Sequence, residues 1–305
     1  YQENAPTPDR LRPGYWPKAH SPFHPGYTGC NGLLKPNGHD IQVQNMIIDW
    51  DHIAKAPLPT NCGWKGTYRV RYSEIGENGK VMMPALADYM QDAAGWGARI
   101  LKLAYDDTVD QGIAWVLARM VIHIRDYPGN GEEILVETWP SGVSRRVATR
   151  DFRLSNSKGD VIGVAQSYWV MFDLRERRAA QWPDWIEERL PDPPGPKLIE
   201  PPMRPAFTTD PLPAIDTIKA RPSDLDLYGH VNNVRLMQWV LGVSGQNSRP
   251  DFHPESLDIQ FRTECRVHER VELRHANGFA AVSREEDSTD LVRAHIVARN
   301  ALALA

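Results

Sequence analysis

An internal repeat is the feature of this sequence that most limits its fold. Residues 71–81 read RYSEIGENGKV, and residues 221–231, which lie 150 positions later, read RPSDLDLYGHV. The matching pairs are Arg71/Arg221, Ser73/Ser223, Glu74/Asp224, Ile75/Leu225, Gly79/Gly229 and Val81/Val231. A weak repeat of this kind is typical of a duplicated fold. A chance match over so short a stretch is the alternative.

The order of the expected elements agrees with a duplication. In the first half, a strand-like stretch at 67–75 precedes an apolar-periodic helix at 84–103, in which Pro84 occupies a favourable first position. In the second half, 216–224 and 231–244 have the same order. Further strand-like runs follow at 112–127, 132–142, 144–156 and 161–173, and at 256–264, 266–276, 278–286 and 291–303. We therefore predict an α+β fold built from two similar units.

Two proline-rich segments divide the chain. Residues 191–213 are expected to form a semi-extended linker, because clustered prolines cannot enter helices or central strands. Residues 1–64 are rich in Pro, Gly, Asn, His and Trp without sustained periodicity, which predicts an irregular N-terminal arm. The first domain would then occupy 65–190, and the second, which carries the candidate active site, 214–305.

The arm has two interpretations. Its composition favours a floppy tail, because polar, proline-rich segments seldom bury enough surface to become ordered. Its large aromatic residues argue against a solvating tail; they are Tyr15, Trp16, Phe23, Tyr27, Trp50 and Trp64. We expect the arm to lie extended across its own domains or across a neighbouring protein subunit, with Tyr15, Trp16 and Phe23 buried.

Composition excludes several classes of function. The chain has 305 residues, of which 41% are hydrophobic, enough for about two globular domains. Its formal net charge of −4 offers no basic field for nucleic acid, and no apolar run reaches the ~20 residues of a transmembrane segment. Cys30, Cys62 and Cys265 are odd in number and lack metal-ligand spacing. We expect a soluble protein of a reducing compartment (plastid, mitochondrion or cytoplasm), with any targeting segment removed from, or never included in, this sequence.

The two copies of the repeat differ in chemistry. The first copy has Gly76, Asn78 and Lys80 where the second has Asp226, Tyr228 and His230. Only the second half therefore keeps a candidate active site.

The second copy lies within a longer motif, DLDLYGHVNN at 224–233, which resembles the signature of hot-dog fold thioesterases. The region from about 66 to 303 is similar to the acyl-acyl carrier protein (acyl-ACP) thioesterases, in which two hot-dog domains lie in tandem. The similar segments are RYSEIGENGKVMMPALADYMQDAA, IAWVLARM, YWVMFDLRERRAAQWP, DLDLYGHVNNVRLMQWVL and IQFRTEC. The resemblance implies a tandem hot-dog fold, with antiparallel sheets each wrapped around a central helix, and hydrolysis of a fatty acyl thioester to free fatty acid.

The resemblance also implies site residues. The family motif has Asp, Asn and His at alternate positions, then Glu and Cys on a later strand, and Asp226, His230, Glu264 and Cys265 match it. Tyr228 stands where the family has Asn, which weakens the acyl-carrier assignment more than it weakens thioester chemistry. The substrate would be acyl-ACP or acyl-CoA, and neither a metal nor an organic cofactor is expected.

Thioester hydrolysis gives each of these residues a role. The reaction needs an activated water or a carboxylate nucleophile, and donors for the developing oxyanion. Asp226 could attack directly or polarise water, His230 could act as base or orient the thioester carbonyl, and Glu264 could serve as general base. Free N–H groups of the helix that begins near Val231 would bind the oxyanion.

The same residues have structural interpretations. Asp224 and Asp226 are suitable helix caps, and Glu264 could be a strand-end charge. Cys265 is more typical of a buried apolar residue than of a nucleophile.

Substrate-binding residues are predicted in both halves. We assign Tyr228, Asn232, Asn233 and Trp115 to this role, although adjacent asparagines are more often cap or turn residues. An acyl tunnel could be bounded by Met82, Met83, Trp96, Trp115 and Met120, and core packing explains the same residues. Contact with an acidic carrier protein or a solvated sheet face would explain the arginines at 145, 146, 150, 153, 175, 177 and 178.

A second function remains open. The chain could be a thioesterase-derived structural subunit of a larger, organellar assembly, whose catalytic chemistry has decayed and whose arm binds other subunits. Tyr228 and the aromatic arm favour this alternative, whereas Asp226, His230 and Glu264 favour the enzyme.

Overall fold

The computed structural model describes residues 46–299 except 206, 209 and 246–251. The predicted burial of Tyr15, Trp16 and Phe23 lies outside the described residues. Within 46–64, the structure has a short helix, α1 (Trp50–Lys55), so the expected irregular arm is regular at this point.

The two halves contain matching sets of elements. The first half has β1 (Trp64–Arg69), α2 (Met83–Ile100), α3 (Tyr105–Thr108), β2 (Ile113–Ile124), β3 (Glu133–Ser144), β4 (Val147–Asn156), β5 (Val161–Asp173), β6 (Arg178–Ala179) and α4 (Asp184–Glu187). The second half has β7 (Ala214–Lys219), α5 (Asn233–Val243), β8 (Pro254–Phe261), β9 (Arg270–Ala276), β10 (Phe279–Arg284) and β11 (Asp290–Ala298). The predicted order of strand, helix and antiparallel strands is confirmed in both.

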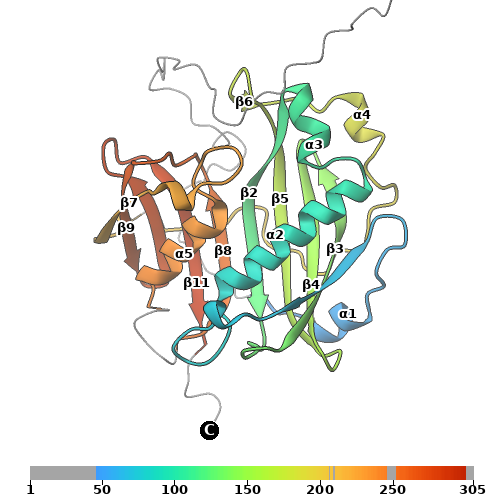
Figure 1. The fold of residues 1–305 in the computed structure, drawn as a ribbon, viewed down its shortest axis with the longest axis horizontal. Coiled ribbons are helices and arrows are strands. Elements are labelled where there is room, and N and C mark those ends of the chain that lie inside the picture. Colours follow the sequence, from blue (N-terminus) through green and yellow to red (C-terminus); the bar gives the residue numbers. More distant parts are fainter. Residues whose placement is uncertain (1–45, 206, 209, 246–251, 300–305) are drawn as a thin grey trace, which may run out of the picture.

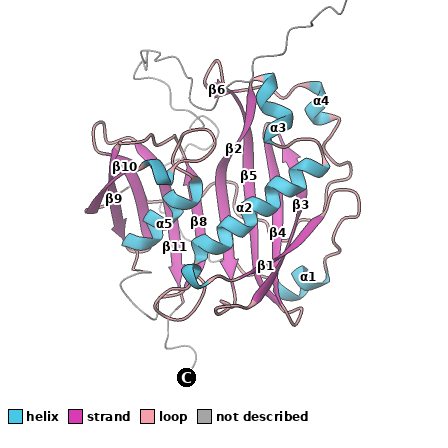
Figure 2. Ribbon diagram, viewed as in Figure 1, coloured by secondary structure: helices cyan, strands magenta, loops and turns pink. Residues whose placement is uncertain are grey.

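The strands of both halves form one antiparallel sheet, with α2 and α5 on the same side of it (Figures 1 and 2). The strand order is β1-β3-β4-β5-β2-β8-β11-β10-β9-β7, and β6 pairs with β5 at the side. The halves therefore meet where β2 pairs with β8. The sequence pattern predicted a sheet for each half but not that the two sheets are continuous.

The 150-residue repeat is visible in the backbone. The short 3-10 helices Tyr72–Glu74 and Pro222–Asp224 occupy equivalent positions, and α2 and α5 begin at residues 83 and 233. Between them, Gly79 and Gly229 both have φ of 75°, which residues with a side chain rarely adopt. The common motif is therefore a turn that leads into the central helix of each half.

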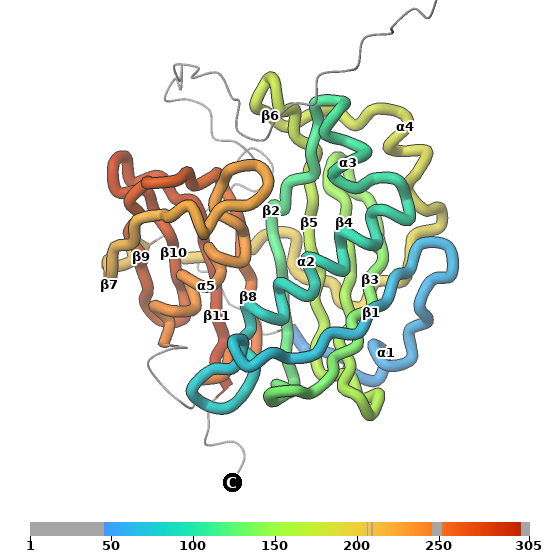
Figure 3. The backbone as a smooth tube through the Cα atoms, in the orientation of Figure 1, coloured from blue at the N-terminus to red at the C-terminus, as the bar shows by residue number. Residues whose placement is uncertain are grey.

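The two central helices cover the main core. Residues spaced three or four apart on α2, such as Met83, Leu86 and Met90, are fully buried against the sheet. Leu236, Met237 and Val240 do the same on α5, and α2 and α5 also contact each other (Figure 3). One hydrophobic cluster therefore spans both halves.

The linker and α1 cover part of the opposite face of the sheet. Leu198 and Ile199 of the linker pack in a second cluster with Ile53 of α1 and Trp139 of β3. The carboxylate of Asp151 accepts a hydrogen bond from the Leu198 amide at 2.6 Å. The linker segment 196–199 is thus pinned to the first half and partly buried.

A buried ion pair joins the two halves across the β2–β8 junction. Arg119 on β2 donates to both carboxylate oxygens of Asp258 on β8, with Nε–Oδ1 at 2.8 Å and Nη2–Oδ2 at 2.7 Å. Its Nη1 donates to the Pro202 carbonyl of the linker at 2.7 Å. The Arg119 side chain is only 3% exposed, so these hydrogen bonds compensate for the loss of water around the guanidinium.

We expect Arg119→Met to lower the free energy of unfolding by about 3–5 kcal/mol, because it leaves a partly buried carboxylate without its partner. Urea denaturation measures the change. The matched control is Arg69→Met, which removes the exposed Arg69–Glu133 pair between β1 and β3 and should cost at most about 1 kcal/mol. Equal losses of unfolding free energy in the two variants would show that the Arg119–Asp258 pair contributes no more than an exposed surface pair.

Candidate functional site

The motif at 224–233 forms a tight turn held by Asp226. Its Oδ1 accepts hydrogen bonds from the backbone amides of Tyr228 at 2.8 Å and His230 at 3.3 Å. The backbone closes the turn, because the Asp226 amide donates to the His230 carbonyl at 2.8 Å. One carboxylate oxygen of Asp226 is therefore committed to the turn, and no hydrogen bond joins the other to a described residue.

Two residues of the motif have structural roles. Asp224 accepts a hydrogen bond from the Arg221 amide at 2.8 Å, as Glu74 does from Arg71 in the first half. Asn232 is the N-cap of α5, and its Oδ1 accepts from the Val234 amide at 2.7 Å. The helix was predicted to begin near Val231, and it begins at residue 233 because Asn232 is its N-cap.

His230 and Glu264 lie side by side. His230 Nε2 is 3.1 Å from Glu264 Oε2, and both side chains are mostly buried. The backbone pins the motif to the segment after β8, since the Val231 amide donates to the Cys265 carbonyl at 2.8 Å. The structure therefore brings together His230 and Glu264, which are 34 positions apart in the sequence.

Two arginines surround the same carboxylate. Glu264 Oε1 accepts from Arg266 Nη2 at 2.7 Å and from Nη2 of Arg177, which belongs to the turn between β5 and β6. Burial alone would raise the pKa of Glu264, but His230, Arg266 and Arg177 outweigh it and hold that pKa below its ordinary value. Glu264 is therefore ionised at neutral pH.

The sequence did not indicate that either arginine belongs to the site. Arg177 was one of seven arginines assigned to a solvated face or a carrier contact, and Arg266 had no assignment. The segment YWVMFDLRERRAAQWP, which contains Arg177, was among the similar segments, and this was the only signal in the sequence.

Tyr228 faces the first half of the molecule. Its ring lies edge-on to that of Tyr105 on α3, with the centroids 5.2 Å apart. Burial, with the nearby Tyr105 and Asp226, raises the pKa of Tyr228, so its hydroxyl stays neutral. Tyr228 thus forms part of the contact between α3 and the motif.

A small cavity of about 20 Å³, lined mostly by apolar side chains, lies between α2, α5 and the sheet. Its walls include Ala94 of α2, Met120 of β2, Met237 of α5 and Phe261 of β8, and Asn233 lines it at the start of α5. Met120 was a predicted tunnel residue and is found in the wall.

Other predicted tunnel residues lie elsewhere. Trp115 packs on Trp182 with ring centroids 5.5 Å apart, in a separate cluster near α4. Trp96 is 51% exposed on the outer side of α2, and Met82 is the N-cap residue of that helix. That a residue is aromatic or apolar did not predict which hydrophobic cluster of the fold it belongs to.

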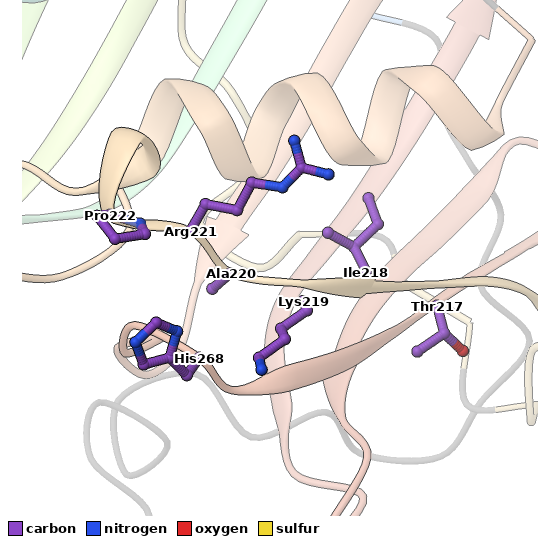
Figure 4. A pocket seen from close by; sticks show the side chains of 7 residues that line it. All are labelled: Thr217, Ile218, Lys219, Ala220, Arg221, Pro222 and His268. Atoms are coloured by element: carbon purple, nitrogen blue, oxygen red, sulfur yellow. The ribbon is translucent and has the colours of Figure 1, made fainter.

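A second, open pocket lies along the edge strand β7 and is shown in Figure 4. Ile218 and Arg221 point to the α5 side of the strand, whereas Lys219 and His268 point to the other side. None of the predicted site residues lines it. The pocket by Asn233 is therefore the one that belongs to the candidate site.

The described residues include two cysteines, Cys62 and Cys265, and both are free and buried. Burial, with a smaller effect of Glu269, raises the pKa of the Cys265 thiol to about 12. Cys265 is therefore a neutral, buried residue, in agreement with its structural interpretation.

Neither a metal site nor a membrane span is found in the described part of the chain. No three His, Cys, Asp or Glu side chains there are grouped to bind a metal ion. No helix in 46–299 combines the length and the apolar character needed to cross a bilayer.

Comparison with known proteins gives a family match in both halves. Residues 62–190 match the acyl-ACP thioesterase N-terminal domain, and residues 212–300 match the acyl-ACP thioesterase C-terminal domain. A chloroplastic palmitoyl-acyl carrier protein thioesterase of Cuphea hookeriana is 26% identical over 73% of this chain and 59% of its own length. The chloroplastic oleoyl-acyl carrier protein thioesterase 1 of Arabidopsis thaliana is 28% identical over 75% of this chain and 68% of its own length. The chain thus spans about three-fifths to two-thirds of these relatives.

Solved structures show the same fold. An acyl-ACP thioesterase from Bacteroides thetaiotaomicron superposes with a TM-score of 0.68 at 21% identity, over 78% of this chain and 98% of its own. The 12:0-ACP thioesterase from Umbellularia californica gives 0.67 at 22% identity, over 78% and 97%. The predicted tandem hot-dog fold is confirmed.

We expect Glu264→Gln to reduce the free energy of unfolding at pH 7 by an amount that shrinks under acid conditions. A lowered pKa in the folded state contributes stability above the unfolded value of about 4.3, and this contribution is lost as the pH falls through the folded value. Denaturation from pH 7 to pH 3 tests this. The control is Glu77→Gln, on the exposed turn of the first half. A loss of unfolding free energy in Glu264→Gln that stays constant with pH would contradict the expectation.

Proposed function

We propose, since the chain belongs to the acyl-ACP thioesterase family, that it hydrolyses fatty acyl thioesters of acyl carrier protein to free fatty acid. The observation that carries the proposal is the His230–Glu264 contact, made beside Asp226 in the half that has the motif. The equivalent first-half positions are Gly76 and Lys80, which supply neither a carboxylate nor an imidazole. The acid, the imidazole and the carboxylate that take part in the reaction are accordingly assigned to the second half.

The Glu264 carboxylate determines which imidazole nitrogen is the base. An ionised carboxylate only accepts hydrogen bonds, so neutral His230 carries its proton on Nε2, which faces Glu264. Nδ1 is then left with a lone pair that can accept a proton. Glu264 therefore orients the histidine and stabilises the imidazolium that forms during the reaction, rather than acting as the base itself.

Hydrolysis can then proceed by general-base catalysis. Water, polarised by the second carboxylate oxygen of Asp226, adds to the thioester carbon as His230 Nδ1 takes its proton. The oxyanion collapses, the C–S bond breaks, and the imidazolium returns the proton to the leaving thiolate. Asn232 caps the amide of Val234, and no hydrogen bond joins the Asn233 amide to a described residue, so that amide is the proposed donor to the oxyanion.

The pocket between the central helices is the proposed acyl site. Its lining includes Asn233, three positions after His230 in the chain, and the apolar side chains of Ala94, Met120 and Met237. The cavity is only about 20 Å³ in this structure, so an acyl chain would enter it only if the lining side chains moved apart. The chain would then replace contact with water by contact with these side chains. Core residues of both halves would then set which chain lengths are accepted.

Acyl-CoA and a structural role remain as alternatives to acyl-ACP hydrolysis. Tyr228 is the observation that favours a decayed, structural protein, because it replaces the family's asparagine and packs on Tyr105. The arm that would bind other subunits lies mostly outside the described residues. Assays of free thiol release from acyl-ACP and acyl-CoA of several lengths decide among these functions, and no turnover with any of them would favour the structural role.

We expect Asp226→Asn to lower turnover at least ~100-fold, the lower range for loss of an acid–base group. Asparagine keeps an Oδ1 acceptor for the amides of Tyr228 and His230, so the turn and the free energy of unfolding should change little. Thiol release and urea denaturation measure the two effects. Lys80→Ala, in the equivalent first-half turn, is the control, and an equal loss of turnover there would show that the reaction is assigned to the wrong half.

We expect Ala94→Leu to shift the preference toward shorter acyl chains. Each methylene that no longer fits the pocket should lower kcat/KM for long chains about fourfold relative to short ones. Gly95→Leu is the control, because a side chain at Gly95 enters open space on the other side of α2. The ratio of kcat/KM between long and short substrates is insensitive to partial unfolding, and an unchanged ratio in Ala94→Leu would exclude this pocket as the acyl site.

A further inference from the structure

The turn between β5 and β6 carries an arginine of the first half to the carboxylate of the second. The Asp173 Oδ1 atom accepts hydrogen bonds from the amides of Arg175 and Glu176, both at 2.8 Å, which fixes the shape of the turn. Arg177 follows with φ of 51°, in the left-handed region. Arg177 adopts this uncommon backbone conformation, and its guanidinium contacts Glu264, which lies 87 positions later in the chain.

The Glu264 carboxylate divides its two oxygens between different partners. Oε1 receives the guanidinium groups of Arg177 and Arg266, and Oε2 faces His230 Nε2. Arg266 is only two residues from Glu264 and moves with it. Arg177 belongs to the first half, so its contact fixes the position of the Glu264 carboxylate relative to that half. The first half includes α2, which forms one wall of the pocket.

We propose that Arg177 is a positioning residue of the active site, which holds the Glu264 carboxylate in the orientation that faces His230. The inference rests on the proposed function, and it adds that the first half completes the catalytic machinery of the second. Arg177 itself touches neither the substrate nor the reacting atoms in this assignment.

The surroundings of Glu264 favour positioning over an ordinary surface ion pair. The Glu264 side chain is 20% exposed, so its contacts are less screened than those of a fully solvated pair. The charged groups that face it are His230 from the motif, Arg177 from the turn and Arg266 from its own segment, while Arg284 Nη2 donates to its backbone carbonyl at 3.3 Å. Losing Arg177 therefore removes one of two guanidinium groups, and it removes the contact that ties the carboxylate to the first half.

The alternative role for Arg177 is contact with the acidic carrier protein, since its side chain is 44% exposed. The two roles differ in kinetics. A carrier contact acts on KM and depends on salt, whereas a positioning residue acts mainly on kcat and on the pH dependence of kcat.

The experiment compares Arg177→Met, Arg177→Lys and Arg178→Met, with acyl-ACP as substrate. Arg178 is an exposed neighbour that no hydrogen bond or ion pair joins to Glu264 among the described residues. In Arg177→Met we expect kcat to fall at least ~10-fold, the loss typical of one charge-assisted hydrogen bond, with KM within about twofold. The acid limb of the pH profile should move to higher pH, because the loss of one positive charge beside the His230–Glu264 pair favours protonation of that pair. Lysine should restore part of kcat, and Arg178→Met should resemble the wild type.

Two results would overturn the inference without affecting the proposed function. One is an unchanged kcat with a raised KM in Arg177→Met, which would assign Arg177 to the carrier contact. The other is an equal loss of kcat in Arg178→Met, which would indicate a general effect of charge on the turn.

A wild-type protein that hydrolyses no thioester would refute the proposed function but would still leave the position of Arg177 testable. The carboxyl carbon of Glu264 can be titrated by ¹³C NMR in the same variants. We expect its midpoint to rise in Arg177→Met and to stay unchanged in Arg178→Met. Equal midpoints in Arg177→Met and the wild type would reject the positioning role.

Discussion

The ion pair between Arg119 and Asp258 is the constraint on which the arrangement of the two halves depends. A guanidinium that is almost fully buried is costly unless it is paired, and Arg119 has its carboxylate only when β2 and β8 pair in the observed register. A slip of one residue would move Asp258 to the other face of the sheet and separate the two charges. The pair therefore selects one register for the junction, whatever its net contribution to stability.

The register of the junction determines what the two halves can build together. It sets α2 beside α5, so that an apolar pocket lies between them, with Asn233 in its lining. It also brings the turn after β5 within reach of the segment after β8, where Arg177 contacts Glu264. Both the pocket and the carboxylate cluster thus combine residues from two domains, although the motif itself lies in one.

Local features of the fold could be predicted from the sequence, and long-range features could not. The repeat, the element order and the starts of α2 and α5 follow from short-range periodicity and from the turn that Gly79 and Gly229 permit. The continuity of the sheet could not be predicted, because alternation identifies a strand but not its partner. In the site, the proximity of His230 to Glu264 was expected only from the resemblance. The contact with Arg177 was not expected, since a charged turn residue gives no sign of a partner 87 positions away.

The asymmetry between the two copies of the repeat also determines the number of sites. Both halves keep the same turn, yet only one turn carries an acid and an imidazole, and the other half supplies a guanidinium and one wall of the pocket. Under the proposed function, this asymmetry gives one composite site per chain instead of two equivalent ones. Each chain would then bind one acyl group at a time, and the described residues of the first half offer no equivalent site through which binding could be cooperative.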